Sequence, residues 1–212
     1  MLFMEQPLRI FLVGFMGCGK STVGRRLAKA LGWSCIDTDG FVECRYHQTV
    51  SHIFETQGEA GFRKIERVVL NELADYEQVV ISTGGGLACF ADNMALMNAR
   101  GLTIYLRTPA TVLAERLWHA KTQRPLLRGK SRDELTQFVA DLLAQRAPFY
   151  EQAAVIVDVK TNDDFAYIDT IVDIIKKINR YLWKRMKAPC KRCMAPCTMC
   201  MKKYRICGIG TH

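Results

Sequence analysis

Hydrophobic positions along the chain alternate between short continuous runs and longer stretches with helical spacing. A continuous apolar run of about 4–8 residues is typical of a strand buried on both faces, whereas apolar residues three and four positions apart indicate one face of a helix. The short runs predict five strands, at Arg9–Val13, Ser34–Asp37, Val79–Ser82, Thr103–Leu106 and Ala154–Asp158.

The stretches between these runs predict helices. Val23, Leu27 and Leu31 share one face of a helix over 22–31, and Gly32 is a stop signal at its end. The other predicted helices cover 41–57, 59–74, 91–99, 110–118, 133–147 and 164–183. Because strands alternate with helices, the expected fold class is α/β, with a five-stranded parallel sheet flanked by helices.

Residues 121–131 (KTQRPLLRGKS) interrupt this alternation with polar residues, Pro125 and Gly129. They precede a helix whose start carries a capping box, Ser131 with Glu134. The stretch is therefore predicted to be a mobile lid loop. It contains Arg124, whose charge could stabilise a transferring phosphate; the alternative is a solvated arginine in a basic loop.

The segment Gly14–Ser21, the glycine-rich loop, fits the pattern G-x-x-x-x-G-K-[ST] between a predicted strand and a predicted helix. Glycines let successive backbone N–H groups point at phosphate oxygens, and the positive end of the helix adds to that field. Lys20 would reach the β- and γ-phosphates, and the Ser21 hydroxyl would bind Mg²⁺. These features favour a small P-loop kinase. The predicted nucleotide-binding residues of this segment are Gly17, Cys18, Gly19, Lys20, Ser21 and Thr22.

Polar and glycine positions follow two other predicted strands. Asp37 and Asp39 end a strand at the edge where open α/β sheets bind ligands, and their spacing of two points both side chains the same way in an extended chain. The alternative is that they cap the next helix. Gly84–Gly86 permits close approach of a ligand to the backbone, or forms a flexible turn.

Arg63 and Arg146 can each present a planar fork to a carboxylate. For an isolated arginine, a surface salt bridge is the alternative. Five motifs in order nevertheless resemble the shikimate kinase family, over about residues 8–183. They are Asp37-Thr38-Asp39, Gly61-Phe62-Arg63, Ser82-Thr-Gly-Gly-Gly86, Arg124-Pro-Leu-Leu127 and Gln145-Arg146-Ala-Pro-Phe-Tyr150.

The resemblance implies phosphorylation of the 3-hydroxyl of shikimate by MgATP, which gives 3-phosphoshikimate and ADP on the route to aromatic amino acids. It implies that Arg63 and Arg146 hold the shikimate carboxylate and that Asp39 serves the attacking hydroxyl. Asp37 would act near Mg²⁺ through water. The implied shikimate-binding residues are Asp39, Arg63, Gly84, Gly85, Gly86 and Arg146, and the implied catalytic residues are Lys20, Asp37, Asp39 and Arg124.

The nucleotide site departs from the family pattern in one place. Many family members carry an arginine on the adenine side seven residues before the lid arginine, but Leu117 stands there in this chain. The neighbouring Arg116 could substitute there, which leaves the adenine contacts open. Arg116 and the lid residue Arg124 are both predicted to bind the nucleotide.

Charge and cysteine divide the chain in two. Of 30 Lys/Arg and 21 Asp/Glu residues, eight basic residues and no acid fall in 184–212, so residues 1–183 have a net charge of +1. An apolar content of 49% is ordinary for a globular protein, and the longest apolar run, Ile10–Met16, is too short to span a membrane. We expect a cytoplasmic monomer without a membrane partner. Its scattered cysteines are expected to be reduced thiols: Cys18, Cys35, Cys44 and Cys89.

The predicted domains are a kinase-like body, 1–183, and a basic tail, 184–212. The tail repeats Ala-Pro-Cys-x-x-Cys and carries Cys190, Cys193, Cys197 and Cys200, which could hold Zn²⁺. A disordered tail is favoured, because it has little to bury. Two alternative functions remain. One is another small-molecule P-loop kinase, for example on gluconate; the other is a nucleotide-dependent protein that binds nucleic acid through the tail, with no such partner for the body.

Overall fold

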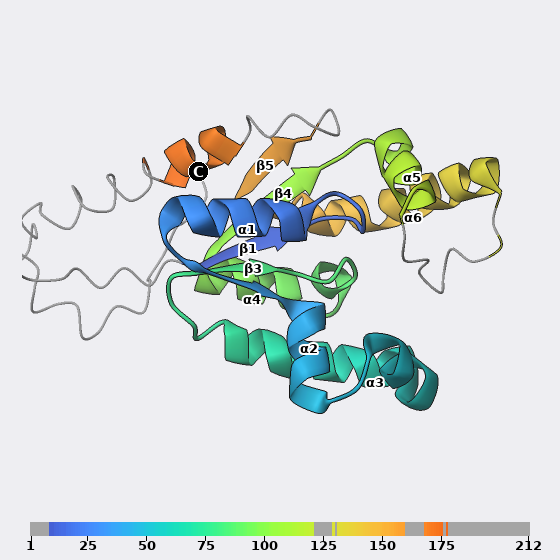
Figure 1. The fold of residues 1–212 in the computed structure, drawn as a ribbon, viewed down its shortest axis with the longest axis horizontal. Helices are drawn as coiled ribbons and strands as arrows, with labels where there is room; N and C mark the ends of the chain where they lie inside the picture. Colours follow the sequence, from blue (N-terminus) through green and yellow to red (C-terminus); the bar gives the residue numbers. More distant parts are fainter. Residues whose placement is uncertain (1–8, 121–128, 130, 160–167, 176, 178–212) are drawn as a thin grey trace, which may run out of the picture. The chain divides into compact units, whose positions relative to one another are not determined.

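The structure, a computed structural model, describes residues 9–120, 129, 131–159, 168–175 and 177 (Figure 1). The chain divides into two compact units, Met1–Ile168 and Asp169–His212. In the second unit, residues 169–175 and 177 are helical, within the helix predicted over 164–183. The predicted division at residue 183 stays a prediction, since the tail 184–212 lies outside the described residues. The sheet and helices that follow belong to the first unit.

Five parallel strands form one sheet in the order β2-β3-β1-β4-β5, which confirms the predicted fold class. Every residue of β1 and β3 is buried, as expected for central strands of a parallel sheet covered on both faces. The strands differ from their predicted bounds by at most one residue at either end. They are β1 Arg9–Val13, β2 Ser34–Asp37, β3 Val79–Ser82, β4 Leu102–Arg107 and β5 Val155–Asp158.

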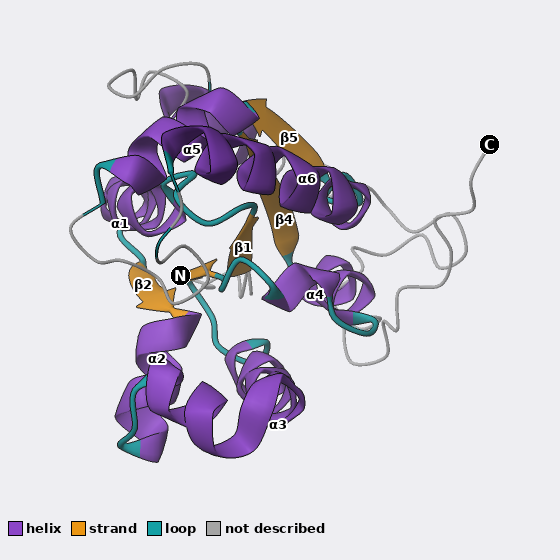
Figure 2. Cartoon of the chain, turned by 90° about the vertical axis from the view of Figure 1, so that its right-hand side faces the viewer, coloured by secondary structure: helices purple, strands orange, loops and turns teal. Residues whose placement is uncertain are grey.

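Helices cover both faces of the sheet. They are α1 Lys20–Leu31, α2 Thr38–Tyr46, α3 Val50–Leu73, the short 3₁₀ helix η1 Leu87–Cys89, α4 Asn93–Arg100, α5 Ala110–Trp118 and α6 Arg132–Tyr150 (Figure 2). Helix α1, which follows β1, and helix α4, which follows β3, lie on opposite faces (Figures 1 and 2). The chain therefore leaves the carboxyl ends of these neighbouring strands in opposite directions, which is where open α/β sheets bind ligands.

The segment predicted as two helices, 41–57 and 59–74, is divided differently. Helix α2 ends at Tyr46 because His47 adopts a left-handed conformation with φ 53°. Helix α3 then begins behind Thr49, whose side chain accepts a hydrogen bond from the backbone N–H of His52. The predicted boundary survives as a kink at Gly58, where φ is 68°. The prediction of one continuous helix over 41–57 was therefore wrong.

Helix α6 is longer than predicted. Its start is the expected capping box, in which the Ser131 hydroxyl accepts from Glu134 N and the Glu134 carboxylate accepts from Ser131 N. Its end passes through Pro148 and stops at Tyr150 instead of residue 147. Proline lacks an N–H and disfavours a helix interior, so the sequence indicated an earlier end. The extra turn brings Tyr150 onto the same helix as Arg146.

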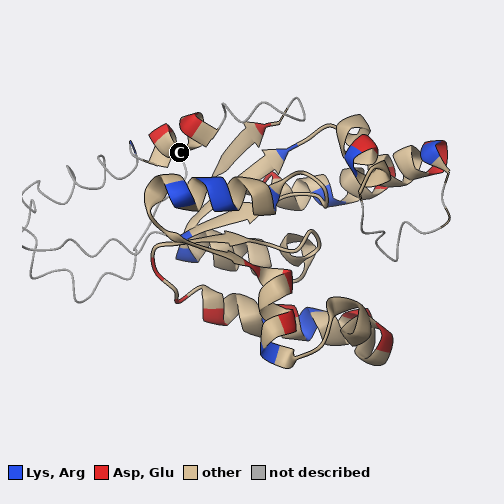
Figure 3. Ribbon diagram, in the orientation of Figure 1, with Lys and Arg blue, Asp and Glu red and all other residues tan. Residues whose placement is uncertain are grey.

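Basic and acidic side chains are interspersed over the described body (Figure 3). This matches the nearly balanced charge of residues 1–183. Within the described ranges, no helix is both long enough and apolar enough to cross a membrane.

Candidate active site

The glycine-rich loop connects β1 to α1 and depends on its glycines. Gly17 and Gly19 have φ values of 82° and 96°, which side-chain-bearing residues rarely adopt. A Cβ at Gly17 would also lie only 3.2 Å from Leu117 Cδ2. Gly19 is the N-cap of α1 and provides no capping side chain, so the first turn of α1 keeps N–H groups that suit an anion.

The ammonium of Lys20 lies at the centre of this loop. It donates to the carbonyl oxygens of Gly14 and Phe15, each at 2.8 Å, and lies 3.7 Å from Cys18 Sγ. Lys20 is only 8% exposed, and Cys18 is buried. The loop therefore holds a positive charge among its own backbone groups, where the sequence predicts phosphate.

Ser21 and Asp37 meet at the carboxyl edge of the sheet. The Ser21 hydroxyl donates to Asp37 Oδ2 at 2.7 Å. The other carboxylate oxygen of Asp37 accepts from the backbone N–H groups of Asp39 and Gly40 and so caps α2. The capping alternative thus holds for Asp37, and the same side chain still presents an oxygen beside Ser21. A hydroxyl and a carboxylate are oxygen ligands of the kind Mg²⁺ prefers.

Three charged side chains lie close to the three-glycine turn, Gly84–Gly86. A Cβ at Gly84 would lie 2.7 Å from Asp39 Oδ1 and 3.0 Å from Glu66 Oε1. A Cβ at Gly86 would lie 2.5 Å from Arg63 Nη2. Any side chain at these two positions would displace a charged group, so the turn's close approach explains its glycines. The sequence predicted Asp39, Arg63 and the turn for one site, and the fold brings them together.

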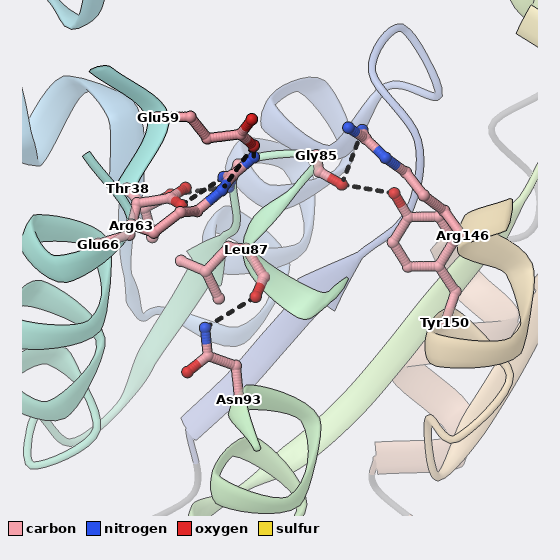
Figure 4. A network of polar contacts seen from close by, with 10 residues as sticks. Thr38, Glu59, Arg63, Glu66, Gly85, Leu87, Asn93, Arg146 and Tyr150 are labelled. Carbon is pink, nitrogen blue, oxygen red and sulfur yellow. Dashed lines mark hydrogen bonds and ion pairs between the residues drawn. The ribbon is translucent and has the colours of Figure 1, made fainter. Parts of the chain in front are cut away.

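Arg63 forms ion pairs with two carboxylates of its own helix. Its Nη1 lies 2.5 Å from Glu66 Oε2 and its Nη2 lies 2.8 Å from Glu59 Oε1 (Figure 4). Burial lowers the pKa of the guanidinium, but these carboxylates outweigh it and raise the pKa overall. The Arg63 side chain is 12% exposed; its partner Glu59 is exposed, as in the salt-bridge alternative, whereas its partner Glu66 is buried.

Glu66 is a site residue that the sequence analysis missed. It is 2% exposed, and burial raises its pKa to about 7, with Arg63 opposing and Asp39 adding to that rise. The available signal was its position three residues after Arg63 on a predicted helix, where the two side chains can meet. A glutamate among apolar neighbours on the buried face of α3 was the second sign.

Arg146 and Tyr150 approach the same turn from α6. Arg146 Nη1 lies 3.5 Å from the carbonyl oxygen of Gly85, and the Tyr150 hydroxyl donates to that oxygen at 2.5 Å (Figure 4). The Arg146 guanidinium carbon also lies 5.8 Å from the ring centroid of Phe15, in the glycine-rich loop. A Cβ at Gly85 would be 3.2 Å from Met16 N. The glycine-rich loop and the three-glycine turn are therefore in direct contact, with Arg146 beside both.

Two further side chains, neither of which was given a role from the sequence, form hydrogen bonds at the ends of the turn. The Thr38 hydroxyl accepts from Gly84 N at 2.8 Å. The Asn93 amide donates to the carbonyl oxygen of Leu87 at 2.8 Å and is completely buried. Both are visible in Figure 4. Backbone partners of this kind depend on how strands and helices assemble, so spacing along the chain does not reveal them.

Arg116 lies against the glycine-rich loop, where its Nη1 donates to the carbonyl oxygen of Gly17 at 3.3 Å. Thr22 is in the first turn of α1, and its N–H donates to Gly19 O. Arg124 and most of the predicted lid lie outside the described residues. So do the tail cysteines, and no group of three or more His, Cys, Asp or Glu side chains in the described part of the chain could hold a metal ion.

Comparisons with known proteins show which family this chain is similar to. The family model for shikimate kinase matches residues 16–176. The shikimate kinase of Parabacteroides distasonis is 53% identical over 150 residues, which cover 71% of this chain and 87% of that protein. A crystal structure of shikimate kinase from Bacteroides thetaiotaomicron is 46% identical, with a TM-score of 0.75, and the match covers 82% of this chain and 98% of that one.

The structure of the Acinetobacter baumannii shikimate kinase in complex with shikimate is 38% identical, with a TM-score of 0.74, over 82% of this chain and 95% of that one. A gluconokinase from Sinorhizobium meliloti is 19% identical over 84% of this chain and 97% of that one. Its TM-score of 0.56 reflects a shared fold alone.

Proposed function

This chain belongs to the shikimate kinase family, and we propose that the residues around its three-glycine turn and glycine-rich loop transfer the γ-phosphate of ATP to the 3-hydroxyl of shikimate. The chain is an ATP-dependent kinase of the shikimate pathway, which leads to aromatic amino acids. One observation supports this site above all: Arg63 and Arg146 flank a glycine turn that contacts the glycine-rich loop.

The acceptor is bound on the turn. Arg63 and Arg146 bind its carboxylate with charge-assisted hydrogen bonds, and the backbone of Gly84–Gly86 approaches its ring and hydroxyls. Asp39, beside Gly84, accepts a hydrogen bond from the 3-hydroxyl. Because Glu59 and Glu66 already hold Arg63, its guanidinium is fixed in place before the carboxylate arrives.

The nucleotide is bound on the glycine-rich loop. Backbone N–H groups of Gly17, Cys18 and Gly19 and the start of α1, at Ser21 and Thr22, cradle its phosphates. Lys20 exchanges its bonds to the Gly14 and Phe15 carbonyls for phosphate oxygens. Arg116, which donates to the carbonyl oxygen of Gly17, is assigned the adenine side by family resemblance. Arg124 from the lid is assigned the transferring phosphate by family resemblance.

Ser21 and Asp37 fit a magnesium ion, because their oxygens already share a hydrogen bond at the carboxyl edge of the sheet. The ion, when bound with ATP, supplies a positive charge that offsets the negative charge of the phosphates. Ser21 would contact it directly, and Asp37 through water.

In the transfer, the 3-hydroxyl oxygen forms a bond to the γ-phosphorus while the bond from that phosphorus to the bridging oxygen of ADP breaks. The hydroxyl proton passes to Asp39, which also aligns the hydroxyl with the phosphate. Lys20 and Arg124 stabilise the charge on the phosphoryl oxygens. The products are 3-phosphoshikimate and ADP.

The alternatives are weaker. The similarity to the gluconokinase reflects the fold alone, whereas the relatives that are 38–53% identical to this chain are shikimate kinases. A nucleic-acid function would depend on the tail, which lies outside the described residues. Cytoplasmic location, a monomeric chain and zinc in the tail stay predictions. Among the described residues, Cys18, Cys35, Cys44 and Cys89 are free thiols.

A coupled assay of ADP release tests the proposal with the full chain, MgATP and either shikimate or gluconate. ADP release should depend on shikimate and stay at background with gluconate. Lys20→Ala should lower turnover by about 10²–10³-fold, and Lys29→Ala, on the exposed face of the same helix, is the matched control. Equal turnover with gluconate, or normal turnover of Lys20→Ala, would overturn the assignment.

A further inference from the structure

We propose that Tyr150 is a positioning residue for the acceptor: its hydroxyl fixes the orientation of the Gly85–Gly86 peptide, so that this peptide's N–H faces the shikimate site. The inference rests on the proposed function of the three-glycine turn. It adds an uncharged residue to those assigned to the site.

Tyr150 is packed in the core. It is the last residue of α6 and is completely buried. Its ring lies against that of Tyr105, with centroids 5.2 Å apart. Its hydroxyl donates to the carbonyl oxygen of Gly85 at 2.5 Å. Arg146 lies one turn earlier on the same helix and reaches the same oxygen only at 3.5 Å, so Tyr150 provides the shorter contact.

The geometry of the Gly85–Gly86 peptide relates this contact to the acceptor site. None of the described peptide bonds is cis, and in a planar trans peptide the C=O and N–H point in opposite directions. With the Gly85 carbonyl held toward α6, the N–H of Gly86 points away from α6. Figure 4 shows Arg63 on the opposite side of the turn from Arg146 and Tyr150. The Gly86 N–H is therefore directed to the side where Arg63 lies.

The other polar groups of the turn are already engaged. Gly84 N donates to Thr38, Gly84 O accepts from Leu87 N, and Gly86 O accepts from Cys89 N. No described residue accepts a hydrogen bond from the N–H of Gly85 or Gly86. These two donors remain for a ligand, and a hydroxyl-rich acid such as shikimate offers matching acceptors.

Glycine makes such an anchor necessary. A Gly-Gly peptide can rotate into orientations that other residues disfavour, and that rotation would turn the Gly86 N–H away from the acceptor. The Tyr150 hydroxyl keeps its proton in the neutral range, because the ordinary pKa of a phenol is about 10 and burial raises it further. The hydrogen bond from Tyr150 to Gly85 is therefore not lost through titration of the hydroxyl at neutral pH.

Tyr150→Phe tests the inference, because it keeps the ring and removes the hydroxyl, which also contacts the side chains of Cys89 and Arg146. The KM for shikimate should rise about 3- to 10-fold, as expected for one net hydrogen bond. The KM for ATP should change less than about twofold, because the glycine-rich loop keeps its own contacts. A protein with 4-aminophenylalanine at position 150, which restores a donor on the same ring, should regain the wild-type KM for shikimate.

Tyr105→Phe is the matched control, since it removes a hydroxyl from the neighbouring ring and that hydroxyl donates to no described residue. Its KM values should equal those of the wild type. Equal rises in both KM values of Tyr150→Phe, no rise in either, or failure of the aminophenylalanine protein to regain the KM would each overturn the inference. The wild-type dependence on shikimate, measured in the same assay, separates these outcomes from a failure of the proposed function.

Discussion

The guanidinium of Arg63 and the carboxylate of Glu66 form an ion pair of 2.5 Å in which the glutamate is 2% exposed. Both side chains lie against the three-glycine turn, together with Asp39. A buried carboxylate with one cationic partner and two acidic neighbours, here Asp39 and Glu59, is sensitive to a change in any of them. A change in this pair should therefore affect the stability of the fold and, if Arg63 binds the acceptor as proposed, acceptor binding as well.

Glu66 should make stability depend on pH. Its pKa rises on folding from 4.5 to about 7, so between these values the folded state binds more protons than the unfolded state. The free energy of unfolding contributed by this group is fully present below about pH 4.5 and falls as pH rises toward 7. Denaturation curves at pH 5 and pH 8 should show this fall in the wild type and a smaller one in Glu66→Gln. An identical pH dependence in both proteins would contradict the raised pKa.

Arg63→Ala and Arg146→Ala should each weaken shikimate binding more than nucleotide binding. Losing a charge-assisted hydrogen bond to a carboxylate costs about 1.5–3 kcal/mol. Calorimetric titration with shikimate and with a non-hydrolysable ATP analogue checks this difference. Arg100→Ala is the control, because Arg100 pairs with Asp75 at the surface. Equal losses for both ligands would place these arginines on phosphate instead.

The same two variants should differ in stability. Arg63→Ala leaves the buried Glu66 without its cationic partner, whereas Arg146 pairs with no carboxylate among the described residues. Thermal melting should therefore show a larger loss for Arg63→Ala than for Arg146→Ala. The reverse order would mean that Arg146 supports the fold more than its contacts indicate.

The Asp37→Asn and Asp39→Asn variants should lose kinase activity for different reasons. Asp37 is bonded to Ser21, so its variant should act through Mg²⁺ and be partly rescued when the magnesium concentration is raised. Asp39→Asn keeps the shape but loses the charge that aligns or accepts the hydroxyl proton, so its turnover should stay low at every magnesium concentration. Rescue of the Asp39 variant alone would exchange the two roles.

A chain that ends at Trp183 should keep its kinase activity within a few-fold of the full chain. Every residue assigned to the site precedes that position, and the eight basic residues beyond it act over a range that salt screens to about 8 Å. Steady-state assays of both chains, with metal analysis of the full one, check this. About one zinc per full-length chain, lost when the cysteines Cys190, Cys193, Cys197 and Cys200 become serine, would contradict the disordered tail.

The sequence alone determined the elements whose cause is local. Continuous apolar runs located the five strands to within one residue, and the alternation with helices settled a parallel sheet. The glycine-rich loop could also be located, because its backbone requires glycine at Gly17 and Gly19 whatever surrounds it. Ordered motifs then identified the family, which the comparisons confirmed.

Only the tertiary structure decided which groups meet around the turn. Gly85 and Tyr150 are 65 residues apart, and Arg116 is 99 residues from Gly17, so their contacts depend on strand order and helix packing. Glu66 becomes a site residue because α3 packs it beside Asp39 and Gly84. Spacing along a chain predicts neighbours on one helix or strand, but a hydrogen bond between distant segments exists only once the sheet has set their positions.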